Sequence, residues 1–229
     1  MVTKNRLPMV RRAVRCFQNQ SYRNRELVIV NDADDGTEDY VKQLQDERVV
    51  YVRPPQINFT LGELRNLSIR IAGGKYVTQW DDDDWYHPER IEIQLAALLE
   101  SGSDMCLLER WTLAWPERNL FYYSKRRSWE GSMLAEKEKI GQYPPLRRGE
   151  DTVLLNECVA RKLRICAIDR PELYIYVVHG INTWDTEHFL RSIFDECTGK
   201  VEGEELERIR ANLFVENKLQ RTPCWRSSG

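Results

Sequence analysis

The chain has 229 residues, 41% of them hydrophobic, and its 34 Lys and Arg against 36 Asp and Glu give a formal net charge of -2. This length suits one large domain with a substantial core, which excludes an intrinsically disordered protein. The near-neutral charge argues against a nucleic-acid-binding protein, because neutralising a phosphate backbone requires a surplus of Lys and Arg on one face.

The first half of the chain alternates short apolar runs with helical patterns. Residues 1–3 look like the end of a strand. Apolar spacing predicts further strands at 27–30, 49–52, 76–80 and 105–108, and helices at 8–17, 37–44, 61–71 and 88–101. We expect Thr37 to cap the second helix, and Ile91, Leu95, Leu98 and Leu99 of the fourth to face inward. The alternation predicts an α/β fold with a largely parallel sheet, whose ligands bind beyond the carboxyl ends of the strands.

The second half is less regular. Residues 109–149 carry many aromatic side chains among charges, which predicts long loops or an irregular antiparallel extension. Further elements are predicted as a helix at 151–161, strands at 163–168 and 173–178, a helical segment at 186–216 and a poorly ordered tail from 217. The six cysteines show no zinc or disulfide spacing, and no apolar run approaches the ~20 residues that cross a bilayer. We therefore expect a soluble, cytoplasmic protein without a transmembrane segment.

Four consecutive aspartates, Asp81–Asp84, follow the strand predicted at 76–80 and precede a new helix. At an effective dielectric constant of 20, two carboxylates ~5 Å apart repel by roughly 3 kcal/mol, so the run requires solvation or a cation. In an extended segment Asp81 and Asp83 would share one face, and Asp82 and Asp84 would point away. Hard oxygen ligands suit Mg²⁺ or Mn²⁺, which commonly bridge carboxylates to a diphosphate. We therefore predict a cation site here rather than a solvated charge run.

Acidic residues occur at two other predicted element ends. Asp32 follows the strand at 27–30, in a stretch where Asp32 or Asp34 could simply form an Asx turn. The functional interpretation of Asp32 is hydrogen bonding to a nucleotide base or ribose. Glu150 and Asp151 begin a helix, where acidic residues ordinarily stabilise the first turn.

In this order, these motifs resemble the GT-A glycosyltransferases of family 2, over about residues 1–180. The segments that resemble family motifs are 3–6 (T-x-N-R), 19–22 (xQTY), 30–33 (VDDGS), 64–66 (ARN), 74–77 with 81–88 (GEYI and DxDDxxxP) and 149–151 (GED). Asn31 and Ala33 depart from the usual Asp and Gly, and the first strand is almost absent. The Q-x-x-R-W motif of processive members is missing, which favours transfer of one sugar at a time.

The resemblance implies a GT-A fold, the Rossmann-like three-layer α/β fold of nucleotide-diphospho-sugar transferases, with a central, mostly parallel mixed sheet. It implies one domain over residues 1–216. Within it we expect a nucleotide-binding half at about 1–104, an acceptor-binding half at about 105–185 and C-terminal helices at about 186–216, followed by the tail at 217–229.

The same resemblance implies a donor site. The implied nucleoside contacts are Thr3, Asn5, Arg6, Asp32 and, near the base or phosphates, Arg65. Asp81 and Asp83 would occupy the DxD positions, with Asp83 contacting the metal most directly and Asp81 the metal or the ribose. Asp82 counts among the donor-binding residues, and Asp82 with Asp84 is the alternative register. The spacing to Pro88 favours the first register.

Three further roles follow from the resemblance or the composition. In inverting members a carboxylate takes the proton of the acceptor hydroxyl, and Asp151 is the predicted general base, with Glu150 as the alternative. His179 follows the last predicted strand and is either structural or, as in several family members, a metal ligand. Trp129 is either a core residue or a platform on which an acceptor sugar stacks.

The sequence thus predicts a glycosyltransferase that uses Mn²⁺ or Mg²⁺ and moves one sugar, with inversion, from a nucleotide-sugar, expected to be UDP-linked. The expected acceptor is a glycan, a lipid-linked glycan or another hydroxyl compound; no nucleic-acid partner is expected, and peripheral membrane association stays open. The alternatives are a non-catalytic nucleotide-sugar or carbohydrate-binding module and one module of a larger polysaccharide synthase. A phosphohydrolase or nucleotidyltransferase is disfavoured, because the D-x-D-x-T nucleophile loop and a Gly-rich phosphate loop are missing.

Overall fold

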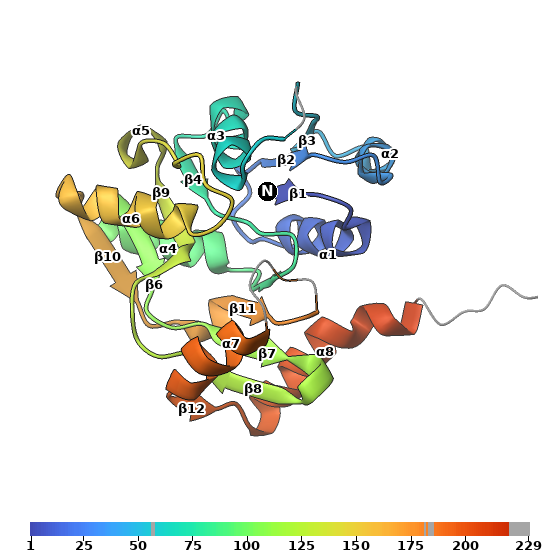
Figure 1. The fold of residues 1–229 in the computed structure, drawn as a ribbon, viewed down its shortest axis with the longest axis vertical. Coiled ribbons are helices and arrows are strands. Elements are labelled where there is room, and N and C mark those ends of the chain that lie inside the picture. The colour runs from blue at the N-terminus through green and yellow to red at the C-terminus, as the bar shows by residue number, and fades with distance from the viewer. Residues whose placement is uncertain (56–57, 181, 183–185, 220–229) are drawn as a thin grey trace, which may run out of the picture.

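Three parallel strands form the first sheet, near the N-terminus (Figure 1). The computed structural model describes residues 1–55, 58–180, 182 and 186–219. The strands are β1 (Val2–Thr3), β2 (Leu27–Asn31) and β3 (Val49–Val52), and the crossover helices are α1 (Leu7–Gln18) and α2 (Thr37–Leu44). Every residue of β2 is buried, as expected for an apolar, β-branched strand in the middle of a parallel sheet. The parallel pairing predicted for this half is confirmed for β1, β2 and β3, whereas the strands predicted at 76–80 and 105–108 lie in a second, mixed sheet.

The second sheet is mixed. Its strands, in the order β10-β6-β9-β4, are β4 (Tyr76–Thr78), β6 (Met105–Leu108), β9 (Trp129–Glu136) and β10 (Ile165–Ile168). β10 runs parallel to β6, whereas β9 runs antiparallel to both of its neighbours. The accompanying helices are α3 (Leu61–Ile71), α4 (Arg90–Glu100) and α6 (Glu150–Ala160).

The third sheet contains the antiparallel extension that the aromatic segment predicted. Its strands, in the order β12-β8-β7-β11-β5, are β5 (Trp85–Tyr86), β7 (Thr112–Trp115), β8 (Leu120–Tyr123), β11 (Tyr174–Val177) and β12 (Gly199–Lys200). β7 and β8 form a hairpin, and β11 runs parallel to β7 but antiparallel to β5. A mostly parallel arrangement is therefore a property of the first sheet, while the other two sheets are mixed.

The C-terminal region differs in detail from the expected run of helices. It holds α7 (Thr186–Ser192) and α8 (Gly203–Leu219), but a 3-10 turn at Phe194–Glu196 and the strand β12 separate them. The predicted tail begins inside α8, and residues 220–229 of it lie outside the described residues. A short helix, α5 (Lys137–Ile140), precedes α6. None of the helices in the described part of the chain is long and apolar enough to cross a membrane.

Two side-chain expectations need correction. Leu99 is 57% exposed, because it lies on the outer face of α4, whereas Leu95 and Leu98 are buried and Ile91 is half-buried as expected. The N-cap of α2 is Gly36, with φ of 82°, and not Thr37, which forms the first residue of the helix. Glycine adopts this left-handed conformation at little steric cost.

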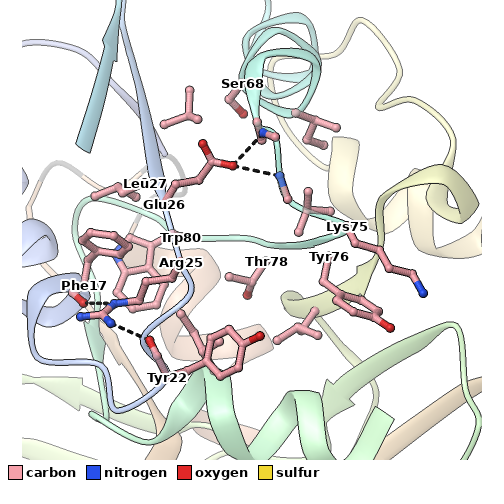
Figure 2. Close-up of a pocket in the computed structure, with 18 of the residues that line it drawn as sticks. Phe17, Tyr22, Arg25, Glu26, Leu27, Ser68, Lys75, Tyr76, Thr78 and Trp80 are labelled. Atoms are coloured by element: carbon pink, nitrogen blue, oxygen red, sulfur yellow. Dashed lines mark hydrogen bonds between the residues drawn. The ribbon is translucent and has the colours of Figure 1, made fainter. Parts of the chain in front are cut away.

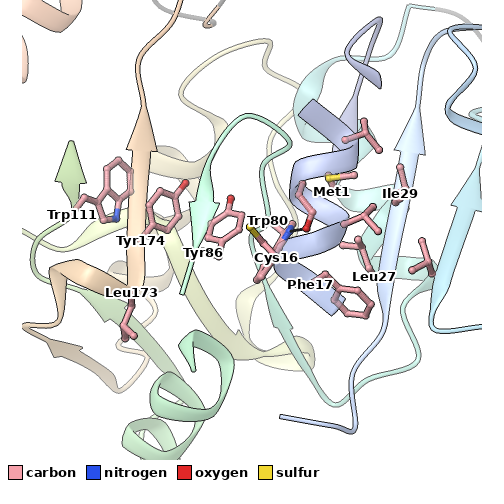
Figure 3. Close-up of a cluster of buried hydrophobic side chains, with 14 of the residues drawn as sticks. Met1, Cys16, Phe17, Leu27, Ile29, Trp80, Tyr86, Trp111, Leu173 and Tyr174 are labelled. Carbon is pink, nitrogen blue, oxygen red and sulfur yellow. Dashed lines mark hydrogen bonds between the residues drawn. The ribbon is translucent and has the colours of Figure 1, made fainter. Parts of the chain in front are cut away.

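A continuous aromatic core connects the first and third sheets (Figure 3). Trp80 lies against α1 and β2, and its ring centroid is 4.0 Å from that of Tyr86. The Tyr86 ring is in turn 5.0 Å from Tyr174 on β11, which stacks on Trp111 at 4.8 Å. Aromatic rings bury large areas in such clusters, so this core fixes β5 and the segment just before it relative to both sheets.

Candidate active site

The acidic run crosses from β4 to β5 and is anchored at both ends by aromatic side chains. Trp80, 3% exposed, donates a hydrogen bond from Nε1 to the Ala13 carbonyl at 3.2 Å. At the other end, the Tyr86 hydroxyl accepts from the Asp81 N–H at 2.7 Å and lies 3.2 Å from the Asp81 carbonyl oxygen, to which it donates. The backbone that carries the aspartates is therefore held by buried groups.

Between these anchors the chain bends instead of running straight, so the predicted two-face alternation holds only in part. Asp82 and Asp84 are buried and Asp81 and Asp83 are half-buried, as alternation predicts. However, Asp82 is not turned away from Asp83, because Arg6 Nη1 contacts both: Asp82 Oδ1 at 3.3 Å and Asp83 Oδ2 at 3.1 Å. One guanidinium thus balances two of the four carboxylates.

Asp82 also joins the run to the end of β1. Thr3, 3% exposed, donates a hydrogen bond from its hydroxyl to Asp82 Oδ2 at 2.5 Å. Burial, and then the charge of Asp83, raises the pKa of Asp82 to about 6, against the opposing effect of the Thr3 hydrogen bond. The structure therefore places the Thr3 hydroxyl on a carboxylate of the acidic run.

Asp84 has a structural position. It is 1% exposed, it accepts from the Tyr174 hydroxyl, and it accepts from the Val177 N–H at 2.9 Å. Burial raises its pKa well above the ordinary value. Because Asp84 is occupied by two donors of β11, the geometry favours the register in which Asp81 and Asp83 face a ligand.

His179 lies just beyond β11 and beside the acidic run. Its Nε2 is 3.2 Å from Asp83 Oδ2, and Asn182 fixes this loop by accepting from the His179 N–H at 2.6 Å. Although burial opposes the shift, the hydrogen bond from His179 lowers the pKa of Asp83. An imidazole nitrogen and a carboxylate oxygen at this separation are suitable donors for one Mn²⁺ or Mg²⁺ ion. Within the described ranges, no group of three or more His, Cys, Asp or Glu side chains forms a ready-made metal cluster.

Arg65 connects the acidic run to the start of α6. Its Nη2 is 3.0 Å from Asp81 Oδ1, and its Nε donates to Glu150 Oε1 at 2.8 Å. Burial alone would lower the pKa of Arg65, but the charge of Asp81 and further acidic groups raises it well above its ordinary value. Arg65, 9% exposed, therefore links two acids, and its expected place near the base or phosphates stays a prediction.

The two acids at the start of α6 have different environments. Glu150 is 2% exposed and bound to Arg65, so it cannot readily reach an acceptor. Asp151 is half-buried and accepts from the Thr152 N–H at 2.8 Å. Burial raises the pKa of Asp151 to about 6, and the nearby carboxylates of Glu150 and Glu130 add to the effect. A carboxylate of this kind is suited to accepting a proton near neutral pH.

The turn after β2 forms a second acidic surface. Asp32 Oδ2 pairs with Lys4 Nζ at 2.9 Å, and Asn5, whose φ is 56°, lies between Lys4 and Arg6. Asp35, which sequence reasoning missed, forms the Asx turn that was considered for Asp32 or Asp34: its Oδ1 accepts from the Thr37 N–H at 3.1 Å. Its other oxygen accepts from the Arg6 N–H at 3.0 Å, so it ties this turn to the end of β1. The position of Asp35, two residues before the helical Thr37, was the sequence signal that could have indicated this Asx turn.

Trp129 is a core residue. It is 5% exposed, its ring stacks on Trp111 with centroids 4.4 Å apart, and its Nε1 donates to the Lys125 carbonyl. The ring faces therefore contact protein, and the acceptor platform is wrong for this residue. Burial of this kind is the usual fate of tryptophan in a strand that crosses a core.

Arg90 is another residue that the sequence did not single out. It is fully buried, its guanidinium lies over the rings of Tyr86 at 4.6 Å and Tyr174 at 4.9 Å, and it donates to the Ser132 carbonyl at 3.3 Å. These two tyrosines bind Asp81 and Asp84, so Arg90 supports the acidic run from behind. A charged residue in the first turn of a helix gives no sequence signal for such a role.

Comparisons with known proteins point in one direction. Residues 1–152 match the family model described as "Glycosyl transferase family 2". The "Putative colanic acid biosynthesis glycosyl transferase WcaA" of Escherichia coli (strain K12) is 37% identical over 99 residues, which is 42% of this chain and 35% of that relative. The chain therefore matches about a third of this relative's length.

Two solved structures have a similar fold. Residues 1–349 of S. aureus TarS, in complex with UDP, give a TM-score of 0.65 at 18% identity, covering 78% of this chain and 59% of that one. The mannosyltransferase PcManGT from Pyrobaculum calidifontis, in complex with GDP-Man and Mn²⁺, gives a TM-score of 0.60 at 16% identity. That match covers 96% of this chain and 68% of the other. At these identities the likeness concerns the fold alone, and it confirms the expected α/β fold of the GT-A type.

Proposed function

The chain belongs to glycosyl transferase family 2, and from this premise we propose that it transfers one sugar from a nucleoside-diphosphate sugar to an acceptor hydroxyl, with inversion. The observation that carries the proposal is the Arg65 bridge. By contacting Asp81 at 3.0 Å and Glu150 at 2.8 Å, Arg65 brings the start of α6, with Asp151, beside the acidic run. This contact supports a single site that combines a donor-binding group with a proton acceptor.

The donor end of the site is assigned to Asp83, Asp81 and His179. Their carboxylate oxygens suit Mn²⁺ or Mg²⁺, and the His179 imidazole adds a nitrogen donor 3.2 Å from Asp83 Oδ2. The same oxygen already pairs with a positive charge, Arg6 Nη1, at 3.1 Å. When bound, the ion supplies charge neutralisation at the leaving diphosphate. The solved structures of similar fold, one with UDP and one with GDP-Man and Mn²⁺, support this choice of ligand class.

The nucleoside is assigned to the surface after β1 and β2. Asp32 and Asn5 lie there, and we place a UDP-linked donor with its base or ribose at Asp32 after exchange of the exposed Lys4 contact. The Arg6 guanidinium, which contacts Asp82 and Asp83, can turn to a phosphate of the donor when the donor binds. Thr3 acts through Asp82 by holding its carboxylate in place.

The acceptor hydroxyl, on a glycan or lipid-linked glycan, is assigned to the side of Asp151. In the displacement, the acceptor oxygen forms a bond to the anomeric carbon while the bond from that carbon to the diphosphate oxygen breaks. Asp151 takes the hydroxyl proton, and the electron pair of the broken bond leaves on the diphosphate. One base is sufficient for a single displacement, which inverts the anomeric centre.

A donor screen tests the proposal. Melting temperatures are measured with UDP, GDP and UDP- and GDP-linked sugars, each with and without Mn²⁺, and the best donor is then assayed for transfer and hydrolysis. We expect a stabilising shift that requires both nucleotide and metal, and Asp83→Ala should remove it while the exposed Asp34→Ala, a matched acidic control, retains it. The anomeric configuration of the product is read by NMR.

Each outcome has a defined meaning. A product with inverted configuration supports the proposed displacement, and a retained configuration overturns it. Metal-dependent nucleotide binding with neither hydrolysis nor transfer across an acceptor library would instead establish a non-catalytic binding module. A shift in melting temperature that is identical with and without Mn²⁺ would show that nucleotide binding does not require the metal.

A further inference from the structure

Two glutamates outside the acidic run each bind the end of a helix, but they contact different kinds of group. Glu26, drawn in Figure 2, accepts hydrogen bonds from the N–H groups of Gly73 and Gly74, just after α3, at 2.7 and 2.9 Å. Glu130 instead accepts from the side-chain hydroxyl of Thr152, in the first turn of α6, at 2.6 Å. Glu26 thus binds backbone groups, whereas Glu130 contacts the residue that follows the proposed base.

The sheet order places Glu130 at the same edge as the acidic run. β9 lies between β6 and β4 and runs antiparallel to both, so it begins where these two strands end. Glu130 is the second residue of β9, and the acidic run follows β4. The side chain of Glu130 is 11% exposed, so its carboxylate lies largely within the protein at this edge of the sheet.

A cation accompanies Glu130 at this edge. Arg127 pairs with Glu130 Oε2 through Nη2, and its guanidinium lies over the Trp129 ring, 4.2 Å from the ring centroid. The Arg127 N–H also donates to the Glu109 carbonyl, just after β6, at 2.9 Å. Ring and backbone contacts therefore hold this cation beside one oxygen of Glu130, while the other oxygen accepts from Thr152.

Asp151 lies between charges of opposite sign. Burial is the main cause that raises its pKa to about 6; Arg65 opposes this shift, and the carboxylates of Glu150 and Glu130 add to it. The titratable and charged groups that face Asp151 from the elements around it are Arg65, Glu150, Glu130, Tyr143 and Tyr176. Burial also raises the pKa of both tyrosines, so they are neutral at pH 7. The charge balance at Asp151 therefore sets Arg65 against the two glutamates.

Thr152 connects the carboxylates of Glu130 and Asp151. Its backbone N–H donates to Asp151 Oδ1 at 2.8 Å, and its hydroxyl donates to Glu130 Oε1. A general base has to lie within reach of the proton that it takes, and small displacements cost large factors in rate. A like charge nearby also stabilises the protonated form of a carboxyl group, which makes the carboxylate a stronger proton acceptor. Glu130 therefore affects Asp151 in two ways, by position and by charge.

We propose that Glu130 is a positioning residue for Asp151: through Thr152 it fixes the first turn of α6, and it places a second negative charge beside the proposed base. This inference rests on the proposed sugar transfer and adds to it a residue that controls the base. Loss of the Glu130 charge should weaken Asp151 as a proton acceptor, whereas loss of the Thr152 hydroxyl should misplace it. Arg127 opposes the charge of Glu130, so its loss should have the opposite effect on Asp151.

The charge effect is measured on the full chain in two ways. One is the pH dependence of kcat with saturating Mn²⁺ and the best donor of the screen, and the other is a ¹³C NMR titration of the Asp151 carboxyl group, assigned by its loss in Asp151→Asn. We expect Glu130→Gln to move both midpoints to lower pH by roughly 0.3–1, and Arg127→Gln to move them to higher pH by a similar amount. Glu26→Gln, at the other glutamate that binds a helix end, should leave both midpoints unchanged.

The position effect is measured with two variants of Thr152. Thr152→Val removes the hydroxyl that donates to Glu130, and kcat should fall by roughly 3–30-fold because the start of α6 is less well held. Thr152→Ser keeps the hydroxyl and should recover most of the wild-type rate. Equal rates of the Val and Ser variants would contradict the positioning role.

The outcomes separate this inference from the proposed function. A wild type that transfers no sugar contradicts the proposed function, whereas an active wild type whose midpoints are unchanged in Glu130→Gln contradicts the inference alone. Midpoints that move in the same direction in Glu130→Gln and Arg127→Gln, or that move as far in Glu26→Gln, would also overturn the inference. If Glu130→Gln does not fold, Arg127→Gln decides: a midpoint that rises supports the role of Glu130, and one that falls or stays in place contradicts it.

Discussion

The acidic run, Asp81–Asp84, and the aromatic core behind it both contact arginines, but in different ways. At the acidic run, Arg6 and Arg65 pair with carboxylates, and the side chains of Arg6, Asp81 and Asp83 keep part of their surface in solvent. In the core, Arg90 is fully buried, lies over the rings of Tyr86 and Tyr174, and donates to amide and hydroxyl oxygens of Gln94 and Thr78.

The difference shows which groups can take part in chemistry. Charge pairs at the edge of solvent can exchange partners when a ligand arrives, whereas a fully desolvated cation cannot leave its partners without a large penalty. The core therefore fixes the acidic run through Tyr86 and Tyr174, whereas Asp81, Asp83, His179 and Asp151 are only half-buried. Mutations should separate the two regions, with loss of activity in the first and loss of stability in the second.

The largest effect should come from Asp151→Asn. Because the variant keeps the shape of the side chain but loses the proton acceptor, kcat should fall by roughly 10²–10⁴-fold. Steady-state transfer assays under saturating donor and metal measure the loss. A variant within threefold of the wild-type rate would remove Asp151 as the base.

The same variant should be more stable than the wild type at pH 7. Burial raises the pKa of Asp151 from 3.8 to about 6, so the folded state binds the proton more tightly than the unfolded chain does. The contribution of Asp151 to the free energy of unfolding is most favourable below about pH 4 and decreases as the pH rises to about 6. At neutral pH the free energy of unfolding is therefore lower by up to about 3 kcal/mol than it would be without the pKa shift. Urea unfolding of wild type and Asp151→Asn at pH 4 and pH 7 measures the difference, which should be present only at pH 7.

In the aromatic region, Trp129→Ala should destabilise the fold by about 3–5 kcal/mol, because it removes a buried ring that stacks on Trp111. Trp129→Phe, which keeps an aromatic ring, should lose much less. Denaturant unfolding gives both values. If Trp129→Ala instead leaves stability intact and raises KM for the acceptor, the ring serves the ligand and the core assignment fails.

Thr3→Val tests a smaller coupling between β1 and the acidic run. It removes the hydroxyl that donates to the buried Asp82, and the resulting loss should be about 1–3 kcal/mol. Thr3→Ser retains the hydroxyl and should recover most of the stability. Equal stabilities of the Val and Ser variants would show that the hydrogen bond contributes nothing measurable.

The smallest effect is expected for Lys4→Ala. The Lys4 side chain is 63% exposed, and its pair with Asp32 should contribute less than about 1 kcal/mol. If Asp32 contacts the nucleoside, this variant should leave folding unchanged and should not weaken nucleotide binding. Titration of the best nucleotide against both proteins provides the comparison.

The sequence predicted the strand ends better than it predicted side-chain environments. The positions of β2 and β6, which are buried on both faces, and of the largely half-buried β3 and β4 followed from short apolar runs. Asp81–Asp84 was singled out because four neighbouring carboxylates at a strand end repel one another and require solvation or a cation. The alternation of these aspartates held only in part, since the chain bends between Asp82 and Asp84 and lets Arg6 contact two neighbours.

Residues that act through tertiary contacts could not be predicted. Nothing local distinguishes a Trp that packs inward, such as Trp129, from one that faces a ligand. Arg90 had no signal, because two of its partners, Ser132 and Tyr174, come from distant parts of the chain. Asp35 was the exception. It lies two residues before Thr37, which is the spacing at which an aspartate side chain accepts from a backbone N–H in an Asx turn.

The central claim is that Asp83 and His179 bind a divalent cation together with a nucleoside diphosphate. Calorimetric titration of UDP, with and without Mn²⁺, into the wild type and Asp83→Asn tests it most directly. We predict that Mn²⁺ tightens UDP binding at least ~10-fold in the wild type and has no effect in Asp83→Asn. Equal UDP affinity with and without Mn²⁺ in the wild type, or an undiminished metal effect in Asp83→Asn, would contradict the account.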